Sequence, residues 1–364
     1  MFSKESARHA DACRFCWMCR HICPVAGSTG NEAWTPHARG LMVSMIERGT
    51  EYNAEIAEIM YHCTLCDACA NDCVTGFKPS DFTREARTLA VVENFAPAKV
   101  FDLIDTITKK GNIFGSDSAD RIFDSVGTLP DKAEVLLYAG QTARSILPQV
   151  AIDAAALLKK AGIAFTMLKD EPASGAYLGE LMGFTGDVQQ AAKAVSERIT
   201  ETGAKTVVVL NPADAGFMHE KYSEWGLLGE VEIVTATAFI ASLIQDGKLH
   251  IDKKPICASL QEPVKLTRGL DEITPLQLIA EAAGVERIDM FLNGKFSRCV
   301  GTVPFELYDP KTVREMVRVR CNDAKRLGSE LMITASPDDT YIMSKYAVEG
   351  IRIADLFALL KERC

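Results

Sequence analysis

Two groups of four closely spaced cysteines lie near the start of the chain. The first group, in "CRFCWMCRHICP" (13–24), comprises Cys13, Cys16, Cys19 and Cys23, and the second, in "CTLCDACANDC" (63–73), comprises Cys63, Cys66, Cys69 and Cys73. Both have the spacing C-x2-C-x2-C-x3-C, in which three thiolates bind one [4Fe–4S] cluster and the fourth ligates the other cluster of a two-cluster protein. The sequence therefore predicts two [4Fe–4S] clusters, one held by Cys13, Cys16, Cys19 and Cys73 and the other by Cys63, Cys66, Cys69 and Cys23.

Other uses of cysteine fit these spacings less well. Zinc sites usually combine C-x2-C pairs across a longer loop, whereas here a third cysteine follows each pair after two residues. Disulfides are disfavoured in a reducing compartment, and such short spacings suit a network of separate disulfides poorly. No histidine needs to replace a cysteine, as in a Rieske centre, because all eight are present. His21 and His62 are candidates for hydrogen bonds to cluster sulfur, with a surface role as the alternative.

The segments around the cysteine groups have the patterns of helices. Between the groups, 35–49 begins with Thr35 and Pro36 and ends at Gly49, as helices commonly do, and 51–62 carries apolar residues at helical spacing. After the second group we expect helices over 80–97 and 97–111. The first 115 residues are therefore predicted to be all-helical around the two clusters.

From about residue 133 the pattern changes to short apolar runs that alternate with amphipathic segments. This alternation predicts α/β structure with a mainly parallel sheet. The segment "TVVVLNPADAGFM" (206–218) resembles "ELMITASPDDTYIM" (330–343), since each is a strand followed by a small polar residue, a proline and acidic residues. Such self-similarity predicts a tandem duplication, with repeats at 133–250 and 251–364.

This layout resembles the iron–sulfur subunits related to heterodisulfide reductase, glycolate oxidase and anaerobic glycerol-3-phosphate dehydrogenase. In that family a two-cluster helical ferredoxin domain precedes two cysteine-rich CCG domains. The resemblance covers nearly the whole chain and implies an α+β multidomain protein. Its parts would be an all-α two-cluster ferredoxin-like domain at 1–115, a CCG-like α/β domain at 133–250 and a second at 251–364.

The CCG motifs of the family are mostly lost in this sequence. In the first repeat the expected cysteines fall on non-cysteine residues, namely Gln141, Ala173, Ser174, Asn211 and Asp214. In the second repeat they fall on Cys257, Cys299, Val300, Ser336 and Asp339. Two thiolates do not supply an iron–sulfur site, and oxygen ligands match such sites poorly. We therefore expect no cluster and no disulfide reduction in the C-terminal half, which is a degenerate CCG-like scaffold.

The remaining cysteines and acidic residues of the repeats have plain structural interpretations. Cys257 and Cys299 are expected to be buried small apolar side chains, in preference to a metal site. Asp214, Asp338 and Asp339 lie near predicted helix starts, where capping is the favoured interpretation. The sequence has no G-x-G-x-x-G turn after its first strand and no G-x-x-x-x-G-K-[ST] loop, which argues against a nucleotide site of the usual form.

Composition narrows the class of protein further. The formal charge of −9 argues against a nucleic-acid partner, which a basic face would favour. The N-terminus has no apolar run typical of a secretory signal, and no apolar stretch has the length of a transmembrane segment. We expect a cytoplasmic location, with peripheral membrane association through a partner as the alternative.

The features together favour an iron–sulfur electron-transfer subunit of an oxidoreductase complex that is not itself catalytic. The resemblance implies a flavoprotein dehydrogenase or electron-transfer flavoprotein as one partner, and a quinone-linked or soluble electron acceptor downstream. Two alternatives stay open. The chain could be a catalytic reductase that uses the cleft between its C-terminal lobes, or a structural or docking subunit whose clusters only stabilise the fold.

Overall fold

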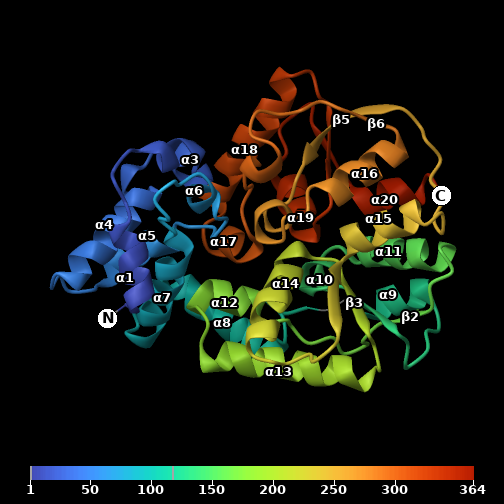
Figure 1. Cartoon of the computed structure of the whole chain (residues 1–364), viewed down its shortest axis with the longest axis horizontal. Coiled ribbons are helices and arrows are strands. Elements are labelled where there is room, and N and C mark those ends of the chain that lie inside the picture. The colour runs from blue at the N-terminus through green and yellow to red at the C-terminus, as the bar shows by residue number, and fades with distance from the viewer. Residues whose placement is uncertain (1, 117–118) are drawn as a thin grey trace.

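The structure is a computed structural model that describes residues 2–116 and 119–364. The helices of residues 4–92 lie on one side, and two lobes, each built on a small parallel sheet, lie on the other, together with the helices of residues 98–126 (Figure 1). The chain is thus α-rich with two small parallel sheets. Within the described ranges, no helix is long and apolar enough to span a bilayer.

The N-terminal part consists of short helices joined by tight turns. Its elements are α1 (Lys4–Asp11), α2 (Met18–Ile22), α3 (Pro24–Thr29), the 3-10 turn η1 (Glu32–Trp34), α4 (Pro36–Glu47), α5 (Ala54–Tyr61), α6 (Ala68–Asn71), α7 (Pro79–Val92), α8 (Ala98–Lys110) and α9 (Ala119–Val126). Thr35 and Asn53 cap α4 and α5 by accepting backbone N–H groups, and Gly111 ends α8 with a left-handed backbone. The four helices expected in this part therefore form, within a few residues of their predicted ends.

The first lobe contains four parallel strands in the order β2-β1-β3-β4. The strands are β1 (Val135–Tyr138), β2 (Phe165–Thr166), β3 (Thr206–Val209) and β4 (Glu232–Thr235). The helical elements are α10 (Gln141–Ser145), α11 (Pro148–Lys160), α12 (Ala176–Met182), α13 (Gly186–Glu201), α14 (Pro212–Phe217), the π-helical turn η2 (Met218–Tyr222) and α15 (Ala236–Gln245). The strand predicted at the start of 206–218 is β3, whereas β4 was not predicted.

The second lobe repeats this order as β6-β5-β7-β8. Its strands are β5 (Ile256–Gln261), β6 (Val285–Arg287), β7 (Leu331–Thr334) and β8 (Arg352–Asp355). Its helical elements are η3 (Lys265–Gly269), α16 (Thr274–Ala283), η4 (Gly294–Phe296), α17 (Val303–Tyr308), α18 (Pro310–Arg326), α19 (Pro337–Tyr346) and α20 (Leu356–Lys361). The identical strand order is what a tandem duplication produces, while the domain boundaries given above remain predictions.

The buried apolar residues of the described chain form three clusters, one of which spans the N-terminal part and both lobes. One buried cluster contains Ile22 and Cys66 of the N-terminal part together with Tyr177 and Phe305 of the two lobes. The lobes pack on each other through α11 with α20 and α15 with α16, and the N-terminal part packs on both through α3 with α18 and α7 with α12. The carboxyl ends of β3 and β7 face each other, since Asn211 and Asp338, which follow them, are hydrogen bonded. The second cysteine loop lies beside this junction (Figure 1).

Candidate iron–sulfur centres

The second centre is a buried cavity that contains one cysteine of the first group. Its lining includes Cys23, Cys63, Cys66 and Cys69. These thiols are close enough to interact, because burial and then Cys66, Cys63 and Cys23 raise the pKa of Cys69 well above its usual value. The structure therefore brings together the four residues predicted to hold one cluster. Ligation itself remains a prediction.

The first centre lies at the surface. Cys16 is exposed, while the other predicted ligands, Cys13, Cys19 and Cys73, are half-buried. Burial raises the pKa of Cys13, and Cys73 and Cys16 raise it further, which places these thiols near one another. Burial and Cys13 raise the pKa of Cys19 to about 12. The predicted set for this cluster is thus also gathered, with one side facing solvent.

Helices α2 and α6 produce the exchange of the fourth cysteines. Each begins at the residue before the third cysteine of its group, and the two helices pack against each other. Cys23 follows directly after α2, and Cys73 follows shortly after α6. Because the helices are paired, the residue that follows each one is delivered to the loop of the other. This local geometry explains the x3 spacing before the fourth cysteine.

The two cysteine loops share an unusual backbone. Phe15 and Trp17 in the first loop have φ values of 52° and 67°, and Leu65 and Asp67 at the matching positions of the second have 49° and 58°. Non-glycine residues rarely adopt this left-handed region, and those that do cluster at functional sites. In each loop the N–H of the residue two after the first cysteine donates to that sulfur at 3.4 Å. The two loops therefore have the same backbone conformation, in which a backbone N–H group points to the first cysteine sulfur.

Two buried polar side chains in the second centre have donor atoms without a protein partner. Arg39 is 1% exposed and donates to the carbonyl oxygens of Trp34 at 2.8 Å and His62 at 3.0 Å. Its Nε has no hydrogen-bond partner, and neither has Ser80 Oγ, although both residues line the cavity. Buried donors normally find acceptors. Cluster sulfurs are such acceptors, so the residues present fit a [4Fe–4S] cluster here.

The histidines named as candidates for hydrogen bonds to sulfur are placed otherwise. His62 stacks on Trp34 at a centroid distance of 3.6 Å, and its Nδ1 lies 3.2 Å from Asp309 Oδ2. His21 lies exposed on α2. The structure shows no hydrogen bond from either side chain to a cysteine sulfur among the described residues. That candidate role therefore has no support.

Cys73 and Cys66 are the thiols most affected by hydrogen bonds. Burial raises the pKa of Cys73, but hydrogen bonds from Thr75 and from the backbone N–H groups of 75–77 outweigh it, so that the pKa is lowered. The neighbouring Cys299 lowers the pKa of Cys66 well below its usual value, while the Cys299 thiol itself donates to the carbonyl oxygen of Gly301 at 3.4 Å. A cysteine of the second lobe thus contacts the second centre, which the sequence did not predict.

The two remaining CCG-motif cysteines have different surroundings. Cys299 is 2% exposed, as predicted for a buried side chain. Cys257 is exposed near the start of β5, where its thiol lies 3.3 Å from Glu286 Oε2, so the prediction of burial was wrong for this residue. The reason is the register of β5, because its opposite end, where Gln261 pairs with Thr334, is the one that reaches the junction between the lobes.

The aspartates predicted to cap helices form a buried network instead. Asn211 and Ser336 are the caps of α14 and α19. Asp338 accepts hydrogen bonds from Thr142 Oγ1 at 2.6 Å, Tyr177 Oη at 2.6 Å and Asn211 Nδ2 at 3.1 Å. Capping was therefore the wrong interpretation, because the small polar residue before each proline takes that role and turns the next acidic residues inward.

Burial dominates the electrostatics of this network. It raises the pKa of Asp214 and of Asp339 to about 7 each, and it also raises that of Asp338. Ser174, at another lost cysteine position, donates to Asp214. Polar side chains thus occupy several of the expected cysteine positions, and the hydrogen bonds to Asp338 join the lobes.

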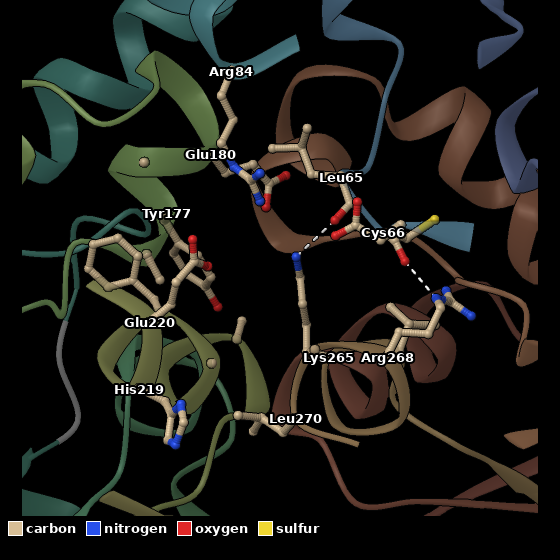
Figure 2. A pocket seen from close by; sticks show the side chains of 18 of the residues that line it. Leu65, Cys66, Arg84, Tyr177, Glu180, His219, Glu220, Lys265, Arg268 and Leu270 are labelled. Atoms are coloured by element: carbon tan, nitrogen blue, oxygen red, sulfur yellow. Dashed lines mark hydrogen bonds between the residues drawn. The ribbon is translucent and has the colours of Figure 1, made fainter. Parts of the chain in front are cut away.

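A pocket of about 340 Å³ lies between the second cysteine loop and the two lobes (Figure 2). Tyr177 and Glu180 reach it from α12, and Lys265 and Arg268 reach it from η3. Lys265 Nζ donates to the carbonyl oxygen of Leu65 at 3.0 Å, and Arg268 Nε donates to that of Cys66 at 2.7 Å (Figure 2). The second lobe thereby fixes the loop, and the pocket gives a small molecule access to the loop from the cleft.

Comparison with known proteins agrees with the chemistry of these centres. Residues 9–77 match the family model of the 4Fe-4S dicluster domain. This range contains both cysteine groups in full, so the predicted iron–sulfur character of the N-terminal part is confirmed. The number of clusters and their individual ligands remain predictions.

The relatives extend over most of the chain. A subunit of the dihydromethanophenazine:CoB–CoM heterodisulfide reductase of Methanosarcina barkeri is 25% identical over 90% of this chain and 86% of its own length. A probable membrane-anchored ferredoxin of Chromohalobacter salexigens is 23% identical over 92% of this chain and 56% of its own length. An EtfAB:quinone oxidoreductase of Syntrophomonas wolfei is 23% identical over 74% of this chain and 40% of its own length.

These relatives confirm the expected resemblance to heterodisulfide reductase-related iron–sulfur proteins. A solved structure of glutamate racemase RacE1 from Bacillus anthracis aligns with a TM-score of 0.31 at 12% identity, over 64% of this chain and 80% of that one. A score this low gives no support for a shared fold. The chain is thus an iron–sulfur protein that is similar to one of the heterodisulfide reductase subunits over nearly its full length.

Proposed function

We propose that the chain is a non-catalytic electron-transfer subunit of an oxidoreductase complex. In this proposal Cys13, Cys16, Cys19 and Cys73 hold one [4Fe–4S] cluster, and Cys63, Cys66, Cys69 and Cys23 hold the other. Each cluster supplies one-electron redox chemistry. The observation that carries the proposal is the packing of α2 against α6, which places an exposed cysteine set next to a buried one.

The two sets differ in what they can reach. Cys16 is exposed, which gives an external redox partner close access to the first set. The second set lies under the interlobe pocket, where Cys66 is part of the lining. An electron that enters at one set thus has a short route to the other. In the second set Cys23, Cys63 and Cys66 are buried, and Cys69 is half-buried.

The partner on the exposed side is proposed to be a flavoprotein dehydrogenase or an electron-transfer flavoprotein. The similarity to an EtfAB:quinone oxidoreductase supports this choice. Three large apolar side chains flank Cys16 in the sequence and are exposed, namely Phe15 at 50%, Trp17 at 49% and Met18 at 58%. Exposed apolar patches of this kind commonly mark interaction sites. They would seat the flavoprotein against the first set.

The downstream acceptor is proposed to be a quinone-linked or soluble electron carrier. One relative is named a membrane-anchored ferredoxin and another a quinone oxidoreductase. We accordingly propose a cytoplasmic chain that associates with the membrane periphery through such a partner.

Anaerobic stopped-flow mixing with a reduced electron-transfer flavoprotein tests the proposal. The oxidised iron–sulfur chromophore should bleach as flavin is reoxidised, with about two electrons taken up per chain for two one-electron centres. Met18→Ser should slow this transfer, whereas Leu327→Ser, which changes a side chain 48% exposed at the end of α18, should not. A chromophore that stays oxidised with flavoproteins of both classes would contradict the assigned partner.

A second candidate function is reduction of a small molecule in the interlobe pocket. It is favoured by one observation, the access that this pocket gives to the Cys66 loop. The pocket also presents two cations, Lys265 and Arg268, that would attract an anionic substrate. Reoxidation of the reduced chain by thiol disulfides, in the absence of any protein partner, would support this candidate.

A further inference from the structure

The second cysteine loop is surrounded by an unusual number of cationic side chains. Arg87, which is fully buried on α7, donates to the carbonyl oxygen of Cys63 at 2.5 Å. Lys265 and Arg268 donate to two further carbonyl oxygens of the loop from the second lobe. Arg39 is the only one of these four cations that lines the cysteine cavity itself.

The position of Arg39 inside this cavity is fixed. Its Nη1 is held by two backbone carbonyl oxygens, those of Trp34 and His62, so the guanidinium has little freedom to turn away. Its Nε remains without a partner, as does Ser80 Oγ on the first turn of α7. A guanidinium is always protonated in proteins, and its N–H groups can only donate. A fixed positive charge that interacts with the thiols of the second set, and two donors without a protein partner, thus belong to residues that line this cavity.

The arginines beside the first cysteine set lie at the surface, and the buried side chain next to Cys19 is His37, whose pKa is lowered by burial, which disfavours its charged form. Arg14 donates to the carbonyl oxygens of Asp11 and Cys13 at the exposed surface, and Arg20 is paired with Glu32. Solvent screens such exposed charges, whereas charges act strongly in a buried site. Both sets consist of four cysteines, so the main difference between them is the buried positive charge beside the second set.

Charge and hydrogen bonds determine the potential of an iron–sulfur centre. Reduction adds one negative charge, and burial alone penalises that charge, as does the carboxylate of Asp67 in the same cavity lining. A buried cation and hydrogen bonds to sulfur have the opposite effect. Arg39 and Ser80 are positioned to provide both.

We propose that Arg39, assisted by Ser80, holds the second centre at a higher reduction potential than the first and so directs electrons from the exposed side toward the interlobe pocket. This inference rests on the proposed function. In each transfer the centre of Cys16 loses one electron and is oxidised, and the centre of Cys66 gains that electron and is reduced. No bond is made or broken. The electron is supplied by a reduced flavoprotein and removed by the downstream carrier.

Potentiometric titration followed by EPR tests the assignment on the full chain. The exposed centre is identified by the enhanced relaxation of its signal when a water-soluble paramagnetic chelate is added. In the wild type the buried centre should be reduced first. Arg39→Gln should shift the electron distribution between the centres at least tenfold toward the exposed one, which is about 59 mV for a one-electron couple. Arg39→Lys should retain most of the wild-type difference.

Matched controls separate this effect from general damage. The potential of the exposed centre serves as an internal reference that Arg39→Gln should leave unchanged. Arg48→Gln removes a cation from the end of the same helix, where the side chain is 70% exposed, and should shift neither potential. If Arg39→Gln fails to retain iron, Ser80→Ala carries the test, because it removes one donor without altering charge and should lower only the buried potential.

The outcomes distinguish this inference from the proposed function. An exposed centre that is reduced first in the wild type, or unchanged potentials in Arg39→Gln and Ser80→Ala, would overturn the role of Arg39 while leaving the relay intact. A wild-type chain that holds only one cluster would overturn the proposed function itself.

Discussion

Cys23, which belongs to the first cysteine group, lies near Cys66 of the second group in one buried cavity. The sequence distance between them is large, but α2 and α6 pack together and bring the end of one group to the loop of the other. This crossed arrangement makes the two centres a single structural unit. Loss of the fourth cysteine of one group should therefore damage the centre formed by the first three cysteines of the other group.

The crossed arrangement predicts an exchange of phenotypes between two variants. Cys23→Ala should impair the buried centre, and Cys73→Ala should impair the exposed centre, because each removes the one ligand that comes from the other cysteine group. Iron per chain should fall from about eight toward about four in each case. The EPR signal that remains, tested for sensitivity to a paramagnetic chelate, identifies the surviving centre. Survival of the exposed centre in Cys73→Ala would show that the ligands are not exchanged.

The position of Cys299 beside Cys66 predicts an effect of the second lobe on the buried centre. Cys299→Val keeps the apolar volume but removes the polar thiol beside Cys66, so the buried potential should fall while that of the exposed centre stays constant. Cys321→Val is the matched control, since Cys321 is also fully buried in the second lobe but belongs to neither cysteine cavity. Equal potentials in Cys299→Val and the wild type would show that Cys299 does not tune the buried centre.

The buried network between the lobes predicts a cost for losing one hydroxyl. Tyr177→Phe removes the hydrogen bond to Asp338 and should lower the free energy of unfolding by about 1–3 kcal/mol. Denaturant unfolding measures this difference. Asp338→Asn should also destabilise, and the double variant should be less destabilised than the sum of the two. Additive effects would indicate that the two side chains do not act on each other.

Asp214 predicts a specific pH dependence of stability. Its pKa is raised by burial to about 7 in the folded chain, above the value of about 4 for an exposed aspartate. The folded state therefore binds more protons, and its stability falls as pH rises from about 4 to 7, by up to about 1.4 kcal/mol per pH unit from this group. Asp214→Asn should be more stable than the wild type at pH 8 and lose that advantage near pH 4. Parallel profiles of melting temperature for the two proteins would contradict this.

The cysteine groups were the features most fully predictable from sequence, because their spacing is set by the geometry of the group they bind. The predicted strands and the repeat were also readable, since alternating apolar runs report burial in parallel sheets. The expected helices of the N-terminal part formed because Thr35, Asn53 and Gly111 give local start and stop signals. These features depend on neighbouring residues alone.

The remaining features depend on tertiary contacts. Arg39 lies on a helix whose sequence gives no sign that a charged residue is buried, and its partners Trp34 and His62 meet it only after α4 and α5 have packed. Cys257 was expected to be buried, but the register of β5 leaves it exposed. The aspartates that follow Asn211 and Ser336 resemble capping residues locally, and only the meeting of the two lobes turns them into a buried network.

Whether the chain holds two clusters is decided by its iron and acid-labile sulfide content, measured on anaerobically purified protein together with the reduced EPR spectrum. Two complete cysteine sets predict about eight irons and eight sulfides, with interacting [4Fe–4S] signals from two centres. About four irons would contradict the two-centre relay. Clearly more than eight would contradict the prediction that the C-terminal half holds no cluster.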